Sequence, residues 1–337
     1  MDLLAEIREK LKGNPSLTLS SGIEAVATHI EVGEKYHYRA KLDNDEHMFT
    51  DVIYRTNHAF EGILKEAYGV FSEEKADHKT PYEIEEYMLS EDILKGRVVD
   101  LLTNYRKNWR NPSTHDYQLF FSEQESYLAI VNVSAFVSIL LDQIIEKLAF
   151  DNKYYELEKA AMLAREAMDD FDKSSPIDKV YKVLYSYTSY YLNNFDEMAG
   201  KPRNTINAEM AAFMKSVAPS FKIKNEPRIE MDGSIVTFDF VVTVDDQDVV
   251  IETRSPKPRY SNDDSAISQL MGQMREAKVV NGIVYHYPGQ KDDIAVATTA
   301  STAWPKDLNL REIYSDDPEA YREHEYEEPV NLVNGKI

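Results

Sequence analysis

The chain has 337 residues, of which 43% are hydrophobic and 29% are charged, so it is long enough for two or three cores and is globular rather than disordered. It contains no cysteine, which excludes disulfides and thiolate metal sites and leaves carboxylates and histidines as metal ligands. The net charge of −21 opposes broad adhesion to nucleic acid, so any site for nucleic acid must be small and local.

The N-terminal segment and the most apolar segment both argue against a membrane protein. The first ten residues, MDLLAEIREK, carry acids and lack an apolar stretch. The apolar run 128–145 is interrupted by Asn132, Ser134, Ser138 and Asp142. We therefore expect no signal peptide, no membrane span and a cytoplasmic location.

Residues 1–150 are predicted to form an all-α helical bundle. Apolar residues recur at helical spacing in 51–71 and again in 90–109. A long apolar helix follows in 122–150, with Ser122 and Glu125 as a capping box at its start. Residues 151–203 hold further helix, with Ser175 and Pro176 at N-cap and N1 positions, and are interpreted as a helical connector.

Residues 204–300 change character and predict an α/β domain. A helix at 204–217 precedes a strand at 235–244 and a second strand at 248–254, and an amphipathic helix at 265–280 precedes a third strand at 282–288. The first two strands are expected to form a hairpin that turns at Asp245 and Asp246. Residues 301–337 are rich in Asp and Glu from Arg311 onward and are expected to form an acidic C-terminal extension, solvated or facing a partner.

The stretch NWRNPSTHDY, residues 108–117, places an arginine and a histidine five positions apart around an Asn-Pro step. On one continuous helix Arg110 and His115 would lie about 140° apart and would not share a face. We expect the helix to break here, with Asn111 as N-cap and Pro112 as N1, so that both side chains lie beside a positive helix end that suits one phosphate.

These groups can cleave RNA without a metal. An imidazole takes a proton from a ribose 2′-OH or gives one to the 5′-leaving oxygen, while a guanidinium stabilises the charge on the scissile phosphate. The alternative is structural: Arg110 pairs with an acid such as Asp116 and His115 caps a helix. The spacing alone does not decide between the two interpretations.

The context of this stretch resembles the HEPN superfamily, whose R-x4-H motif lies between an amphipathic helix and a long apolar final helix. The similarity covers about residues 20–150 and includes the segment YRTNHAFEGILKEAY, residues 54–68. The resemblance implies a metal-independent endoribonuclease that acts as a homodimer, with both motifs lining one cleft. It would make Arg110 and His115 the catalytic pair and Asn111 their polar support.

A second set of residues lies in the α/β region. Asp239 is the one charge in an apolar strand, and the turn at Asp245 and Asp246 would place it opposite Glu252, where two carboxylates could bind a hard divalent ion such as Mg²⁺. We expect Glu209 to add an oxygen, and we expect substrate to be oriented by Gln269 or Gln273.

This arrangement resembles the PD-(D/E)xK restriction-endonuclease-like fold over about residues 204–290. The lysine of that motif is replaced by Arg254, which cannot release its proton near neutral pH, so a role that needs a neutral amine would fall to Lys257. An active metal site, a degenerate binding module and a purely structural hairpin all remain open.

Three functional hypotheses follow. The first is an endoribonuclease of prokaryotic antiviral defence or toxin activity, with RNA as substrate and a C-terminal domain that senses or cuts a second nucleic acid. The second is a metal-dependent DNase that uses Asp239 and Glu252, with the helical domain as dimer platform. The third is a non-catalytic scaffold for nucleic acid or protein.

Overall fold

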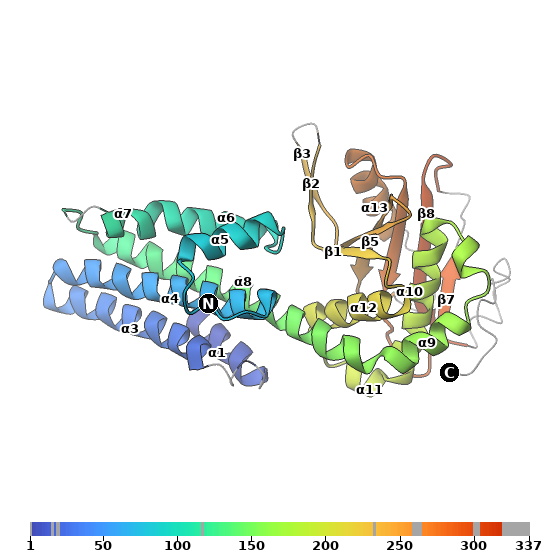
Figure 1. The fold of residues 1–337 in the computed structure, drawn as a ribbon, viewed down its shortest axis with the longest axis horizontal. Helices are drawn as coiled ribbons and strands as arrows, with labels where there is room; N and C mark the ends of the chain where they lie inside the picture. The colour runs from blue at the N-terminus through green and yellow to red at the C-terminus, as the bar shows by residue number, and fades with distance from the viewer. Residues whose placement is uncertain are drawn as a thin grey trace. The chain divides into compact units, whose positions relative to one another are not determined.

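The computed structural model describes residues 2–14, 17, 21–115, 118–231, 234–257, 265–298 and 304–318 of the chain. The chain divides into two compact units, residues 1–148 and residues 149–337 (Figure 1). The first unit is helical, whereas the second is built around a mixed β-sheet. The predicted combination of a helical domain and an α/β domain is therefore confirmed at the level of fold class.

The N-terminal unit is a set of packed helices. They are α1 (Leu3–Gly13), α3 (Ser21–Asp43), α4 (His47–Ser72), α5 (Pro81–Ser90), α6 (Gly96–Tyr105), a π-helical turn η1 (Arg106–Arg110), α7 (Asn111–His115) and the part of α8 (Glu123–Glu156) before residue 149.

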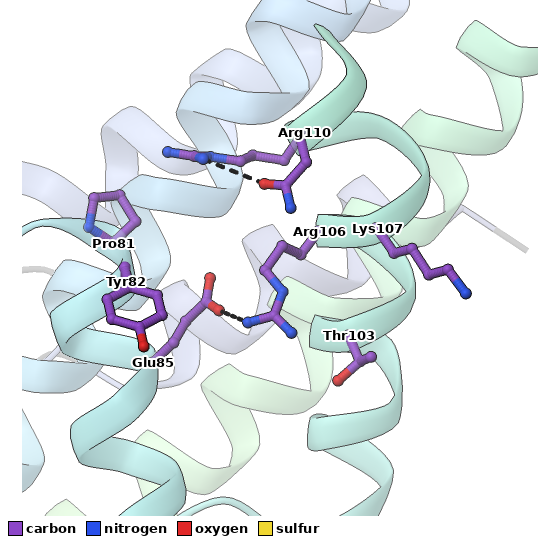
Figure 2. A pocket seen from close by; sticks show the side chains of 8 residues that line it. Pro81, Tyr82, Glu85, Thr103, Arg106, Lys107 and Arg110 are labelled. Atoms are coloured by element: carbon purple, nitrogen blue, oxygen red, sulfur yellow. Dashed lines mark hydrogen bonds and ion pairs between the residues drawn. The ribbon is translucent and has the colours of Figure 1, made fainter. Parts of the chain in front are cut away.

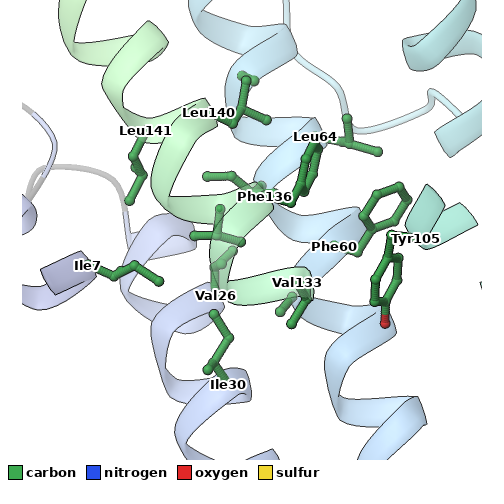
Figure 3. Close-up of a cluster of buried hydrophobic side chains, with 14 of the residues drawn as sticks. Ile7, Val26, Ile30, Phe60, Leu64, Tyr105, Val133, Phe136, Leu140 and Leu141 are labelled. Atoms are coloured by element: carbon green, nitrogen blue, oxygen red, sulfur yellow. The ribbon is translucent and has the colours of Figure 1, made fainter. Parts of the chain in front are cut away.

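The core of this unit follows the apolar spacing of the sequence. The side chains predicted to form one stripe of α4 are fully buried: Val52, Phe60, Ile63, Leu64 and Ala67. Phe60 stacks on Tyr105 and lies 5.1 Å, between ring centroids, from Phe136 of α8 (Figure 3). Side chains that recur every three or four residues thus bring α4, α6 and α8 together.

Helix α8 is capped and buried. Ser122 Oγ accepts a hydrogen bond from the Glu125 N–H at 3.3 Å, and the Glu125 carboxylate accepts one from the Ser122 N–H at 2.8 Å, which confirms the predicted capping box. The helix is long and apolar enough to cross a membrane, but 67% of its apolar window is buried inside the fold. Its polar side chains are also used internally, because Lys10 of α1 contacts Ser138 Oγ at 2.7 Å and Asp142 at 2.9 Å. Helix α8 packs as the core helix of a soluble bundle does.

The C-terminal unit joins helices to a six-stranded sheet and a separate hairpin. Its helices after α8 are α9 (Glu158–Glu166), the 3-10 turn η2 (Phe171–Lys173), α10 (Pro176–Asn193), α11 (Phe195–Met198), α12 (Arg203–Val217) and α13 (Ser265–Glu276). Its strands are β1 (Lys222–Asn225), β2 (Arg228–Met231), β3 (Ser234–Thr237), β4 (Phe240–Val244), β5 (Gln247–Arg254), β6 (Asn281–His286), β7 (Ile294–Thr298) and β8 (Asn309–Asp316).

The large sheet has the order β1-β4-β5-β6-β8-β7, in which β5, β6 and β8 run parallel and the other pairs are antiparallel. Helices α10 and α12 cover one face, where they pack on Ile251, Ile283 and Ile313. Helix α13 covers the other face and packs on Val250 and Val284. The predicted hairpin is confirmed, because Val244 pairs with Gln247 and the two aspartates between them adopt φ of 48° and 58°.

Three sequence expectations for this unit need correction. Residues 151–203 do not form a separate connector, because α9 and α10 share one hydrophobic core with the sheet. Residues from Arg311 to Asp316 are not a solvated extension, because they lie in β8 between β6 and β7. The expected strand 235–244 is divided: β3 pairs only with β2, and β4 joins the large sheet. Residues 319–337 of the expected extension lie outside the described residues.

Candidate active sites

The helix that carries Arg110 does not break at the Asn-Pro step. Helix α6 continues into the π turn η1 and then into α7, and Asn111 has helical angles, φ −67° and ψ −47°. The Asn111 N–H bonds to the carbonyl of Arg106, five residues earlier. This wider turn comes directly before Pro112, which has no N–H to donate and whose ring crowds the carbonyl four residues earlier.

The predicted roles of Asn111 and Pro112 as N-cap and N1 of the long helix are therefore wrong. That helix begins at Glu123 with Ser122 as its cap. His115 is the last residue of α7, and its side chain lies outside the described residues, as do Asp116 and Tyr117. The backbone is helical from Arg110 to His115, so the predicted break that would place both residues beside one helix end is not formed.

Arg110 is held against α4. Its Nε donates to Glu61 Oε1 at 3.3 Å and its Nη1 to Asn111 Oδ1 at 3.3 Å, while 24% of the side chain stays exposed. The acid that pairs with Arg110 is thus Glu61. Asn111 thus contacts Arg110 directly, and its predicted supporting role stays a prediction.

A partly buried polar network joins the motif helix to α4. Asn57 Nδ2 donates to Ser113 Oγ at 2.8 Å, and the Tyr105 hydroxyl lies 3.0 Å from Asn57 Oδ1 and 2.7 Å from Thr56 Oγ1. Burial raises the pKa of Tyr105, so its hydroxyl stays protonated and donates. The network places the π turn on a rigid support.

A cavity of about 420 Å³ opens between this helix and α5 (Figure 2). Helix α5 contributes Pro81, Tyr82 and Glu85 to its lining. The motif helix contributes Thr103, Arg106, Lys107, Arg110 and Asn111. This cavity could not be predicted from the sequence, because its two walls lie about twenty residues apart in the chain and show no motif in common.

The cavity carries more positive than negative charge. Arg106 Nη1 donates to Glu85 Oε2 at 2.5 Å, and only 4% of the Glu85 side chain is exposed. Burial raises the pKa of Glu85, and Arg106 beside it opposes that rise. Lys107 is exposed and forms no ion pair within the described residues. Glu85 pairs with Arg106, and Glu61 pairs with Arg110 from outside the lining, so Lys107 leaves a net positive charge that suits an anionic ligand.

The second candidate site lies where β4 begins and β5 ends. Asp239 occupies the bend just before β4. Its Oδ2 accepts hydrogen bonds from the Thr253 N–H at 2.7 Å, from Thr253 Oγ1 at 2.6 Å and from Arg203 Nη2 at 2.7 Å. Asp239 is thus held by Thr253 of β5 and by Arg203 at the start of α12. The partner predicted for it across the strands was Glu252.

Glu252 is buried beside this aspartate. Burial and the negative charge of Asp239 raise the pKa of Glu252 to about 7. Arg254 Nη2 lies 3.6 Å from the Glu252 carboxylate and has no hydrogen-bond partner within the described residues. Gln273 of α13 faces the same carboxylate and opposes the rise in its pKa. The predicted closeness of Asp239, Glu252, Arg254 and Gln273 is therefore present.

Three other predicted residues are directed elsewhere. Glu209 accepts a hydrogen bond from Lys201 at 2.7 Å. Lys257 contacts both carboxylate oxygens of the buried Glu312, at 2.9 Å and 3.0 Å, so it does not replace the missing lysine beside Glu252. Gln269 is exposed on α13. We expected a carboxylate or a metal ion next to Asp239. Arg203, which was not predicted from the sequence, occupies that position.

Within the described residues no group of three or more histidines and carboxylates has the geometry to hold a metal ion. Asp239 and Glu252 remain two carboxylates with arginines close to both. A divalent ion would need Glu252 deprotonated and Arg203 displaced from Asp239.

Comparison of the chain with protein-family models, with curated proteins and with solved structures finds no match.

Proposed function

We propose that the N-terminal unit is a metal-independent endoribonuclease in which Arg110 and His115 are the catalytic residues and Asn111 supports the arginine. The observation that carries the proposal is the cation-lined cavity that includes Arg110 and Asn111. A phosphodiester bound there would be neutralised by guanidinium groups that are already ordered by Glu85 and Glu61.

The chemistry needs two proton transfers. A neutral imidazole removes the proton of the ribose 2′-OH, whose oxygen attacks the phosphorus and breaks its bond to the 5′ oxygen. The imidazolium formed in this way gives that leaving oxygen a proton, which returns the imidazole to its neutral form. The products are a 2′,3′-cyclic phosphate and a free 5′-OH, and the guanidinium stabilises the charge on the phosphate during the transfer.

The continuous helix favours a homodimer as the active form. Two positions five residues apart on an ideal helix lie about 140° apart, so a second copy that faces the first would supply the missing partner for each phosphate. This matches the HEPN-type arrangement with both motifs in one cleft. We place the enzyme in the cytoplasm and, by that resemblance alone, in prokaryotic antiviral defence or toxin activity.

The test is cleavage of a mixed tRNA and mRNA pool in EDTA. We expect wild-type protein to cut, and we expect His115→Ala and Arg110→Ala each to lose about 10²- to 10³-fold in rate while staying folded. His78→Ala and Arg39→Ala, which change exposed residues of the same types outside the cavity, serve as matched controls. Unchanged cleavage by the His115 variant would reject the proposal.

Mixing the two inactive variants tests the dimer. If each site uses Arg110 of one chain and His115 of the other, a mixed dimer regains one intact site and part of the wild-type rate. A mixture that exchanges subunits and stays inactive would place both residues of a site in one chain.

A second candidate function is favoured by the position of Glu252 beside Asp239. In this proposal the C-terminal unit binds a second nucleic acid and, with Mg²⁺ held by these two carboxylates, cuts DNA. DNA cleavage that requires Mg²⁺ and is lost in Glu252→Ala would support it. Protein that cleaves neither RNA nor DNA at high concentration with Mg²⁺ or Mn²⁺ would favour a non-catalytic scaffold.

A further inference from the structure

The cavity beside Arg110 has two chemically different ends. Tyr82, at the first turn of α5, is 67% exposed, whereas the Glu85 side chain, three residues later on the same helix, is almost completely buried. An aromatic ring therefore stands at the mouth and a carboxylate at the bottom. A site for phosphate alone would require neither of these groups.

The polar groups at the bottom are only partly used. Glu85 Oε2 is bonded to Arg106, but Glu85 Oε1 makes no hydrogen bond within the described residues. Arg106 has five N–H groups, and the same contact uses one of them. Figure 2 shows the Arg106 guanidinium directed at the Glu85 carboxylate, so a donor and an acceptor lie next to each other.

We propose that this cavity is a base-binding subsite that takes a guanine of the RNA, with Tyr82 stacking on the base and the Arg106 and Glu85 pair contacting its edge. Guanine presents O6 and N7 as acceptors, which arginine binds in the commonest specific base contact. It also presents two adjacent donors, N1–H and N2–H, for the free carboxylate oxygen. Adenine and cytosine offer a carboxylate one amino group, and uracil offers one N–H.

The dimensions and position fit this ligand. A volume of about 420 Å³ lies within the range of roughly 300–1,000 Å³ that small-molecule sites occupy. Arg110 lies one helical turn after Arg106, so a phosphate attached to a bound guanosine would lie near the proposed catalytic arginine. The meaning of the subsite for cleavage rests on the proposed function, but the binding of guanine does not.

The experiment measures binding and needs no cleavage. The affinities of full-length protein for GMP, AMP, CMP and UMP are compared in EDTA by calorimetry, with guanosine and inorganic phosphate as separate ligands. We expect GMP to bind about tenfold or more tightly than the other nucleotides, and guanosine to bind more tightly than inorganic phosphate at the same concentration.

Variants assign the effect to the two ends of the cavity. Glu85→Gln is expected to reduce the affinity for GMP to that for the other nucleotides. Tyr82→Leu is expected to weaken all four by about fivefold to tenfold, and Tyr82→Phe to keep wild-type affinity. Tyr82 is exposed, so its variants remain informative if Glu85→Gln unfolds the protein.

Equal affinity for all four nucleotides would overturn the inference, as would GMP binding that ignores both the Tyr82→Leu and Glu85→Gln changes. These binding results can be told apart from the cleavage results that test the proposed function. A guanine preference without RNA cleavage keeps the subsite and rejects the nuclease. His115-dependent cleavage without any guanine preference does the reverse.

Discussion

Individual residues in both sites have charge states set by close neighbours. Glu252 is buried next to Asp239, and these two influences together raise its pKa, whereas Arg254 at 3.6 Å opposes the rise. Asp239 keeps its own contacts with Arg203 and Thr253. Glu252 is therefore partly protonated near neutral pH, and a divalent ion would have to displace that proton before it binds.

This pKa predicts how stability varies with pH. The folded Glu252 has a pKa of about 7 against an ordinary value of 4.5, so the folded state holds the proton more tightly between these values. The stabilisation is complete below about pH 4.5 and is lost as pH rises through about 7. We expect the C-terminal unit to lose up to about 3 kcal/mol over that window relative to a Glu252→Gln variant.

The measurement is urea unfolding in EDTA at several pH values, followed by the fluorescence of Trp304 in a Trp109→Phe background. Trp304 packs against the α13 side of the sheet. Glu276→Gln, an exposed change on α13, is the control and should track the wild type. A free-energy difference between wild type and Glu252→Gln that stays constant with pH would contradict the assignment.

Among the elements, the π turn η1 sets the direction of Arg110. It ends at Arg110, just before Pro112, and it shifts the register between α6 and α7. Turns of this kind are rare and occur frequently at functional sites. The Asn57 and Tyr105 network holds the turn in place from α4.

Replacing Pro112 by alanine restores a backbone N–H and removes the ring. We expect the free energy of unfolding of the N-terminal unit to rise by about 1 kcal/mol, because proline is unfavourable inside a helix. We expect RNA cleavage to fall by roughly tenfold to a hundredfold, since a regular α-helix would turn Arg110 away from its present direction. Urea unfolding and the cleavage assay in EDTA measure the two effects.

Pro176→Ala is the matched control, because Pro176 lies at the first position of α10, where an N–H has no helical partner. It should leave both stability and cleavage close to wild type. A Pro112→Ala protein that keeps full activity would show that the π turn does not position Arg110.

At the scale of the whole molecule, the two units have separate cores. Phe136 belongs to the core of the helical unit, and Phe240 belongs to the core shared by α10, α12 and the sheet. Each unit also contains one of the two tryptophans, Trp109 in the first and Trp304 in the second. Unfolding of each unit can therefore be followed separately.

We expect Phe136→Ala to destabilise the N-terminal unit by about 3–5 kcal/mol and to leave the C-terminal transition unchanged. Phe240→Ala should do the reverse. Single-tryptophan variants, Trp304→Phe and Trp109→Phe, report the two transitions in urea. Equal shifts of both transitions by either variant would mean that the chain unfolds as one cooperative unit.

Local sequence signals predicted the parts of the fold that depend on neighbours in the chain. Apolar residues at helical spacing marked α4 and α6, Ser122 and Ser175 marked two helix starts, and the two aspartates marked the hairpin turn. The same kind of local signal led to a wrong prediction, a helix start at the Asn-Pro step. Asn111 and Pro112 favour a helix start in isolation, whereas packing on α4 keeps the helix continuous.

By itself the sequence determined that a helical unit precedes an α/β unit, because residue periodicity and caps act over a few residues. Only the tertiary structure decided that Arg203 reaches Asp239, that β8 enters the sheet, and that Glu85 meets Arg106 in a cavity. Those contacts join residues about twenty to forty positions apart or strands paired in space. Burial and backbone pairing select them, and neither leaves a pattern that repeats along the chain.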